Sequence, residues 1–338
     1  MSNWNTYLQI IEDNKKELYR STLKAFAHSH HHTRSSVLKP QEPDYIASLT
    51  SYGIPEMAAE WKSILAPYGI ATSVVSIFCH GRPIVSHKLS GTNPEIGDLL
   101  IVHVHHPRKG KSRRTALLLQ AKMLDDVTVE IKKDDHQWLL YRHWPNFDFV
   151  KPRIRGINID VKPKKAHRGA QYLLVDDHQY MGPFSCVYST SEVANTLIPE
   201  QSLSQVVFKL LSFKEGKAFF GRKASMQRLD WSRLIWTLME KSTGKNFRRI
   251  NSGIHSEPRS HVSNPGGMSG LFAYLTSNSG TRHHSFLSEI FGAEKWGQID
   301  QFDGGYFESE EENGISIVVI ETSHIGEEDS VPVMKRGD

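Results

Sequence analysis

Residues 97–124 read GDLLIVHVHHPRKGKSRRTALLLQAKML, and this stretch decides the fold. Its two apolar runs, 98–106 and 115–124, have the length and the composition of β-strands. The polar, basic segment 107–114 between them is expected to be a loop. Strands joined by so short a connection are usually neighbours in one sheet. The stretch therefore predicts two paired strands, the second of them buried on both faces.

Three polar residues interrupt this apolar pattern. Asp98 opens the first strand, and Gln120 and Lys122 lie on the second. Side chains at i and i+2 of a strand share a face, so pairing of the strands is expected to bring Asp98 beside Gln120 and Lys122. Burying such groups without partners is unfavourable. A half-exposed strand with a capping Asp98 is the alternative, but Leu118 would then be expected to be polar as well.

The flanking segments predict helices and strands in a definite order. Residues 56–65 follow a proline and are expected to be helical, and 71–89 are rich in β-branched residues. A helix with an aspartate cap is expected at 134–144, and a further strand at 171–176. The order from residue 56 to 176 is therefore α-β-β-β-α-β within an α/β fold.

This arrangement resembles the PD-(D/E)xK nuclease superfamily, in the Gln-x-Lys variant found in Mrr-like restriction endonucleases. The matching residues are 97-GD-98 and 120-QAK-122, with a helix on either side. The resemblance covers about residues 56–176. It implies a restriction-endonuclease-like mixed sheet as the core of the fold, with a more helical C-terminal extension.

The resemblance also implies a site that binds Mg²⁺ or Mn²⁺. A carboxylate, an amide oxygen and a backbone carbonyl are hard oxygen ligands suited to these ions. The expected metal ligands are Asp98, Gln120, the Ala121 carbonyl and Glu60 of the preceding helix, with Glu95 as an alternative to Glu60. Lys122 is expected to assist the attacking water. Because glutamine replaces a glutamate here, the site has one negative charge fewer and is expected to bind metal weakly without substrate.

The charge distribution is consistent with a polyanionic partner. Net charge is +4 overall, but residues 103–170 hold 16 Lys and Arg against 7 Asp and Glu, whereas residues 300–338 hold 2 against 11. A basic segment favours nucleic acid, although it equally fits a solvated surface. The residues expected to contact phosphates are Arg108, Lys109, Lys111, Arg113, Arg114, Lys151, Arg153 and Arg155.

Three regions are expected along the chain. Residues 1–55 contain an amphipathic helix over 3–27 and a loop over 33–55; residues 56–180 form the nuclease-like core. Residues 181–338 are expected to be helical and mixed, with helices at 202–212 and 229–242, an irregular segment over 251–285 and an acidic tail. A strand over 315–321 is expected either at the edge of the core sheet or in a separate layer.

Composition excludes several classes of protein. The chain has 338 residues, 38% of them hydrophobic and 23% charged, which is typical of a globular protein rather than a disordered or fibrous one. It has no apolar run near the length of about 20 residues that spans a bilayer. Two cysteines cannot form a disulfide framework, so Cys79 and Cys186 are expected to be buried thiols in a cytoplasmic protein.

The function that these observations predict is metal-dependent hydrolysis of nucleic acid, most simply DNA, in bacterial restriction or defence against phage. Two alternatives stay open at this point. One is a nuclease-like scaffold or nucleic-acid-binding subunit that does not cleave, and the other is a protein-interaction subunit. A homodimer or a larger defence complex would fit the first function, since cutting both strands of DNA usually needs two active sites.

Overall fold

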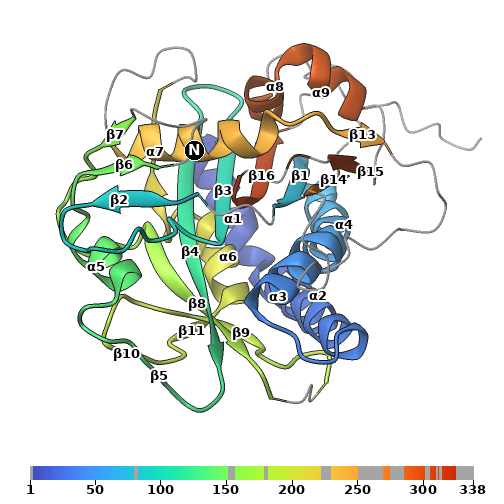
Figure 1. Ribbon diagram of the computed structural model, residues 1–338. Coiled ribbons are helices and arrows are strands. Elements are labelled where there is room, and N and C mark those ends of the chain that lie inside the picture. Colours follow the sequence, from blue (N-terminus) through green and yellow to red (C-terminus); the bar gives the residue numbers. More distant parts are fainter. Residues whose placement is uncertain are drawn as a thin grey trace, which may run out of the picture.

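The central feature of the computed structural model is one large mixed sheet with helices on both faces (Figure 1). The structure describes residues 3–79, 83–150, 157–178, 182–221, 230–249, 269–274, 285–300, 305–309, 311 and 314–324. From one edge, the strands of the sheet are β11 (Gln201–Ser202), β9 (Tyr188–Ser191), β8 (Ala170–Asp176), β4 (Arg113–Leu124), β3 (Leu99–His106), β16 (Ser316–His324), β1 (Ile70–Phe78), β14 (Ser269–Tyr274), β15 (Gly305–Ser309) and β13 (Arg248–Arg249).

The paired strands expected from residues 97–124 are confirmed. β3 and β4 are antiparallel, with Leu99 opposite Leu119, and β4 continues five residues beyond this pair. On its other side β4 pairs in parallel with β8, from Leu118 to Leu124. The end of β4 that carries Gln120 and Lys122 therefore has a strand neighbour on the β8 side but extends past the start of β3.

The late strand lies where neither expectation placed it. β16 is neither an edge strand nor part of another layer; it lies inside the sheet, parallel to β3 and antiparallel to β1. Its core is the apolar run 317–320, which is buried on both faces. The fold is thus mixed α/β, but β1, β3 and β4 are not three consecutive neighbours in the sheet.

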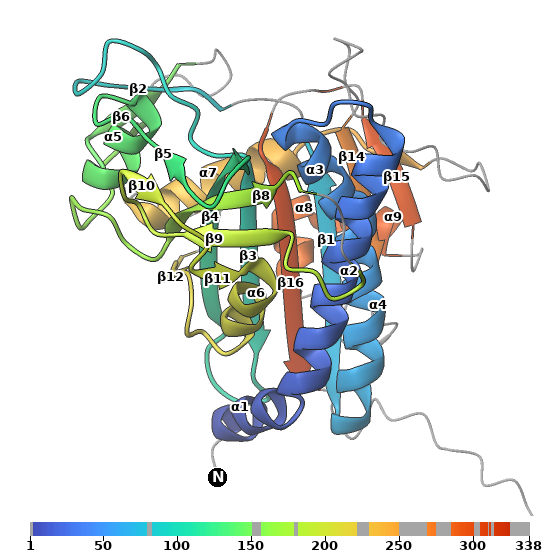
Figure 2. The same cartoon turned by 90° about the horizontal axis from the view of Figure 1, so that it is seen from below.

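Two helical layers cover the sheet. One face packs against α2 (Lys15–Ser36), α4 (Ile54–Leu65) and α6 (Leu203–Leu211), and the other against α5 (His136–His143), α7 (Trp231–Thr243) and α8 (Phe286–Phe291). Figure 2 shows α2 and α6 in front of the strands and α7 and α8 behind them. Residues of β4 alternate between these layers: Leu117 and Leu119 face the layer of α2, α4 and α6, and Leu118 and Leu124 face the layer of α5, α7 and α8.

The N-terminal region is more helical than the sequence indicated. The helix expected over 3–27 is two helices, α1 (Asn3–Asp13) and α2, and the expected loop over 33–55 contains α3 (Glu42–Ser48) and the helical turn Leu49–Gly53. The helix start at α3 is encoded by a capping box between Gln41 and Asp44, with proline at the second position. The loop was predicted because three prolines and a glycine lie in this segment.

The remaining elements largely follow the sequence. α5 begins after Asp135, which accepts a hydrogen bond from Trp138 N at 2.8 Å, and α6 and α7 begin after Ser202 and Asp230. The segment 251–285 is not uniformly irregular, because its described part includes β14; the rest lies mostly outside the described residues. α9 (Ala293–Ile299) follows α8. Short sheets are formed by β2 (Val85–His87), β6 (Phe147–Phe149) and β7 (Asn158–Ile159), and by β5 (Val129–Glu130) and β10 (Thr196–Leu197), while β12 (Lys217–Ala218) pairs with β4.

The two cysteines differ in exposure. Cys79 is buried as expected, but Cys186 is exposed, because it lies in the connection before β9 rather than within a strand. Within the described residues, every helix is too short or too polar to cross a bilayer.

Candidate functional site

A cluster of polar side chains lies where β4 extends past the start of β3. Asp98 directly precedes β3, and the preceding Gly97 fits only because it lacks a side chain. A Cβ atom on Gly97 would lie 2.9 Å from Leu118 Cδ1 and 3.0 Å from the Tyr141 hydroxyl oxygen. The same hydroxyl donates a hydrogen bond of 2.7 Å to the Ile96 carbonyl, which anchors the segment to α5.

Asp98 is held by the open edge of β4, where this strand extends past β3 and its N–H groups on that side have no strand partner. Its Oδ2 accepts a hydrogen bond of 2.7 Å from Ala121 N and a further one from Gln120 Nε2. Ala121 has no partner residue in β3, since the register of the pair begins with Leu99 and Leu119. The carboxylate therefore satisfies an N–H group that the end of the ladder leaves open, as the capping alternative requires.

Gln120 has a buried atom without a partner, which a capping role for Asp98 does not explain. Its side chain is 5% exposed, and its Nε2 donates to Asp98. Its Oε1 is buried and has no hydrogen-bond partner among the described residues. A buried amide oxygen without a partner costs about 1–3 kcal/mol of stability. Such an atom is a site where an additional ligand, a cation or a water molecule, would be stabilised.

Lys122 is positioned by a residue that the sequence analysis did not identify. Its Nζ donates a hydrogen bond of 3.0 Å to Oε1 of Gln137, which is buried in the first turn of α5. The side chains of Gln120 and Lys122 share the face of the sheet that α5 covers, as the i and i+2 spacing predicted. The signal in the sequence was a glutamine four residues before Tyr141, which places both on one side of α5.

Glu42 is a second residue that the sequence analysis missed. It lies in the first turn of α3, and its Oε1 accepts a hydrogen bond of 3.3 Å from Met123 N. Glu42 and Asp98 thus receive the N–H groups of two alternate residues, Met123 and Ala121, along the same open edge of β4. It was missed because residues 33–55 were interpreted as a loop, although the capping box marks a helix start there.

The electrostatic environment of Asp98 is unusual for a carboxylate. Burial raises the pKa of its carboxyl group to about 7, and the hydrogen bond from Ala121 N opposes this rise. The charges of Glu95 and Glu42 raise the pKa further, whereas Lys122 lowers it. The site therefore has more acidic than basic groups around a buried carboxyl, an environment that a bound cation would relieve.

The two glutamates proposed from sequence have different positions. Glu60 is exposed on α4, which packs on the opposite face of the sheet from Gln120 and Lys122, over β1. The structure therefore does not bring Glu60 to Asp98. Glu95 lies close enough to raise the pKa of Asp98, in a short bridge with Ile84. The helical carboxylate that does lie at the open edge of β4 is that of Glu42, on α3.

The basic residues expected to contact phosphates are not gathered at this site. Arg108, Lys109 and Lys111 are exposed in the loop between β3 and β4, at the other end of the strands. Eight residues of β3 put roughly 25 Å between that loop and Asp98. Figure 2 shows α1 near this loop and α3 at the opposite end of the sheet.

Of the five other basic residues expected to contact phosphates, the structure describes two. The Arg113 guanidinium lies 3.8 Å from the centre of the Trp4 ring, and Arg114 pairs with Glu289 at 3.2 Å. Both are thus engaged within the protein at the distant end of the strands. Lys151, Arg153 and Arg155 lie outside the described residues.

The oxygen atoms at this site are of the kind that binds a hard cation, but few of them carry a negative charge. Among the described residues, no group of three or more His, Cys, Asp or Glu side chains is arranged to hold a metal ion. Two carboxylates, those of Asp98 and Glu42, lie along the open edge of β4, and the side-chain amide of Gln120 lies beside Asp98. The buried, unpartnered Gln120 Oε1 is the observation that favours an additional ligand here.

Comparison with known proteins adds no further assignment. The chain matches no protein family model, no curated protein and no solved structure. The geometry and the residue types of this site therefore carry the functional argument.

Proposed function

We propose that this protein is a metal-dependent phosphodiester hydrolase that acts on nucleic acid, most simply DNA. The observation that carries the proposal is the buried, unpartnered Oε1 of Gln120 beside Asp98, near the end of β4, where the next residue on that face towards the strand end is Lys122. The resemblance of 97-GD-98 and 120-QAK-122 to a nuclease motif supports the same reaction class. A setting in restriction or defence against phage follows from the resemblance.

The residues of the site have separate roles in this proposal. A bound Mg²⁺ or Mn²⁺ would polarise the phosphate and lower the pKa of its water. Asp98, Gln120, the Ala121 carbonyl and Glu42 would hold the ion. Lys122 would place its positive charge where negative charge develops on the phosphate, and Gln137 would fix the direction of its Nζ.

The direct test is cleavage of plasmid DNA and of a structured RNA by the purified protein in Mg²⁺, Mn²⁺ or EDTA. We expect cleavage that needs the metal and falls at least about 100-fold in Asp98→Ala and in Lys122→Ala. Lys16→Ala removes the same charge from an exposed position on α2 and is the matched control. Cleavage that survives both site variants would contradict the proposal.

A second measurement tests the metal site independently of turnover. Gln120→Glu adds a carboxylate beside Asp98, which destabilises the metal-free protein by repulsion and strengthens cation binding. We expect Mn²⁺ to raise the melting temperature of this variant more than that of the wild type. Equal shifts in the two proteins would show that Gln120 does not contact the ion.

The non-cleaving scaffold remains a second candidate, and one observation favours it. Asp98 Oδ2 already receives two hydrogen bonds from Gln120 and Ala121, so the cluster is partly satisfied without an ion. A scaffold would bind DNA in a salt-dependent manner, without cleavage and without a thermal shift in Mn²⁺.

A further inference from the structure

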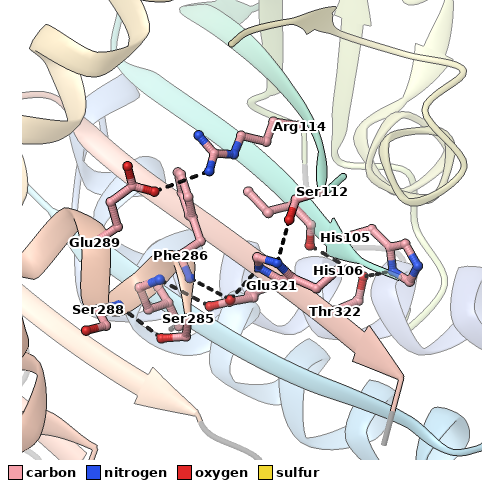
Figure 3. Close-up of polar contacts among 12 residues, drawn as sticks. His105, His106, Ser112, Arg114, Ser285, Phe286, Ser288, Glu289, Glu321 and Thr322 are labelled. Carbon is pink, nitrogen blue, oxygen red and sulfur yellow. Dashed lines mark hydrogen bonds and ion pairs between the residues drawn. The ribbon is translucent and has the colours of Figure 1, made fainter. Parts of the chain in front are cut away.

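A second polar cluster lies at the other end of β3, in the loop that leads to β4. Figure 3 shows Ser112, His106 and Glu321 in a row, from a loop and two neighbouring strands. Ser112 Oγ lies 2.8 Å from His106 Nδ1, and His106 Nε2 lies 2.7 Å from Glu321 Oε1. This is the order of a nucleophile, a base and a carboxylate beside the base, and the carboxylate contacts the His106 ring closely without being aligned for a hydrogen bond to Nε2.

The carboxylate of this row is firmly fixed. Glu321 belongs to β16 and is 6% exposed. Its Oε1 accepts a hydrogen bond of 2.7 Å from Phe286 N, and its Oε2 accepts one of 3.2 Å from Leu287 N, both in the first turn of α8. These two bonds hold the carboxylate in place, so that it contacts one ring nitrogen of His106 and leaves the other directed at Ser112.

The hydroxyl group at the opposite end of the row is accessible. Ser112 is exposed, and its neighbours Lys111 and Arg113 are exposed as well. The Arg113 guanidinium is stacked on Trp4, so its charge stays beside the loop. A large substrate can therefore reach Ser112, and a negatively charged one is favoured by the basic residues around it.

We propose that Ser112 is a nucleophile activated by His106 and Glu321 towards carboxylic esters that carry negative charge. In the step, Ser112 Oγ forms a bond to the ester carbonyl carbon while its proton passes to His106 Nδ1. The bond between that carbon and the leaving alkoxide breaks, and His106 returns the proton to the alkoxide, which leaves as the alcohol. Water releases the acyl group by the same path, with His106 as the base.

This second site is separate from the candidate metal site. Ser112 and Asp98 lie near opposite ends of β3, roughly 25 Å apart along the strand. The reaction proposed here needs no metal ion, and its failure would leave the nuclease proposal unaffected.

The test is the rate at which a fluorophosphonate labels individual serines in the full chain in EDTA, followed by peptide mass spectrometry. In this reaction Ser112 Oγ bonds to phosphorus, fluoride leaves and the proton passes to His106. Ser35 is an exposed serine on α2 whose hydroxyl donates to the His31 carbonyl, and it serves as the internal control. We expect Ser112 to be labelled at least about 100-fold faster than Ser35, at the lower edge of the roughly 10²–10⁴-fold gain from a positioned base.

Variants of the row decide whether the contacts cause the reactivity. His106→Gln should reduce labelling of Ser112 to the rate of Ser35, and Ser112→Ala should abolish labelling at that peptide. Glu321→Gln should have an intermediate effect; because Glu321 also holds α8, its result counts only if the variant melts as a folded protein. Equal labelling of Ser112 and Ser35 in the wild type, or unchanged labelling in His106→Gln, would overturn the proposal.

Discussion

At the scale of single residues, the glycine before Asp98 is as necessary to the geometry of the site as the polar residues are. Gly97 has a φ of +156° and lies against Leu118 and the Tyr141 hydroxyl. The Gly-Asp pair is common in turns, but here the first residue determines whether the second reaches the edge of β4. The pair is therefore a packing motif as well as a chemical one.

We predict that Gly97→Ala destabilises the protein by about 1–3 kcal/mol, the usual effect of forcing a methyl group into a packed site. The free energy of unfolding in urea measures this. Gly91→Ala is the matched control, since a Cβ atom there meets nothing within 4 Å. A similar loss in both variants would show that the contact with Leu118 does not set the effect.

Buried histidines make the free energy of unfolding depend on pH. Burial lowers the pKa of His103 to about 3, of His105 to about 2 and of His167 to about 3. The unfolded chain takes up these protons near pH 6.5, whereas the folded protein does not until the pH is far lower. Below pH 6.5 the unfolded state therefore binds more protons, and the free energy of unfolding falls.

We predict a loss on the order of 2 kcal/mol for each of these histidines between pH 7.5 and 5. Asp98 acts in the opposite direction: burial raises its pKa to about 7, so the folded state gains its proton first as the pH falls. The net change is still a loss, because three histidines oppose one carboxyl. Urea unfolding from pH 7.5 to 5 measures it, and His105→Phe, which keeps a ring stacked on Tyr7, should flatten the curve. A rise in stability towards pH 5 would contradict this prediction.

At the scale of elements, α5 is the element that directs the lysine of the site. It begins at the Asp135 cap and presents Gln137 to Lys122 and Tyr141 to the Ile96 carbonyl. One short helix thus fixes the positions of both Lys122 and the segment that carries Asp98. Its cap was evident in the sequence, but its contact with Lys122 was not, because that contact depends on how α5 packs across β4.

We predict that Gln137→Leu lowers the cleavage rate about tenfold or more, while the Mn²⁺-induced shift in melting temperature stays as in the wild type. The reason is that the variant removes the acceptor of the Lys122 ammonium and leaves Asp98, Gln120 and Glu42 intact. Single-turnover cleavage and thermal melts in Mn²⁺ give the two readouts. A loss of the Mn²⁺ shift would instead assign Gln137 to the geometry of the whole site.

At the scale of the whole molecule, the sheet depends on a strand from the far end of the chain. β16 lies between β1 and β3, and its apolar residues pack in both layers of the core. Without β16, β1 and β3 would each expose an unpaired edge and lose packing on both faces. The order of strands therefore ties the candidate site to residues more than 190 positions away in the sequence.

We predict that residues 56–180, expressed alone, do not fold into a stable domain, whereas residues 1–324 do. Circular dichroism and a cooperative urea transition distinguish the two outcomes. The longer fragment retains every strand of the described sheet and serves as the control. A cooperative transition in the shorter fragment would show that the core tolerates direct contact of β1 with β3 or leaves those edges solvated.

The sequence by itself determined the local elements and the pairing of β3 with β4. Apolar runs, an aspartate cap and a short loop specify these through contacts between near neighbours, which is why Asp98 could be placed beside Gln120. The same locality explains what it could not determine. Glu42, Gln137 and the position of β16 depend on contacts between segments that are distant in the chain. Glu60 was expected at the site from the resemblance, which does not tell which face of this sheet the helix covers. Only the tertiary structure decided these, since burial of two helical layers against one sheet fixes which distant segments meet.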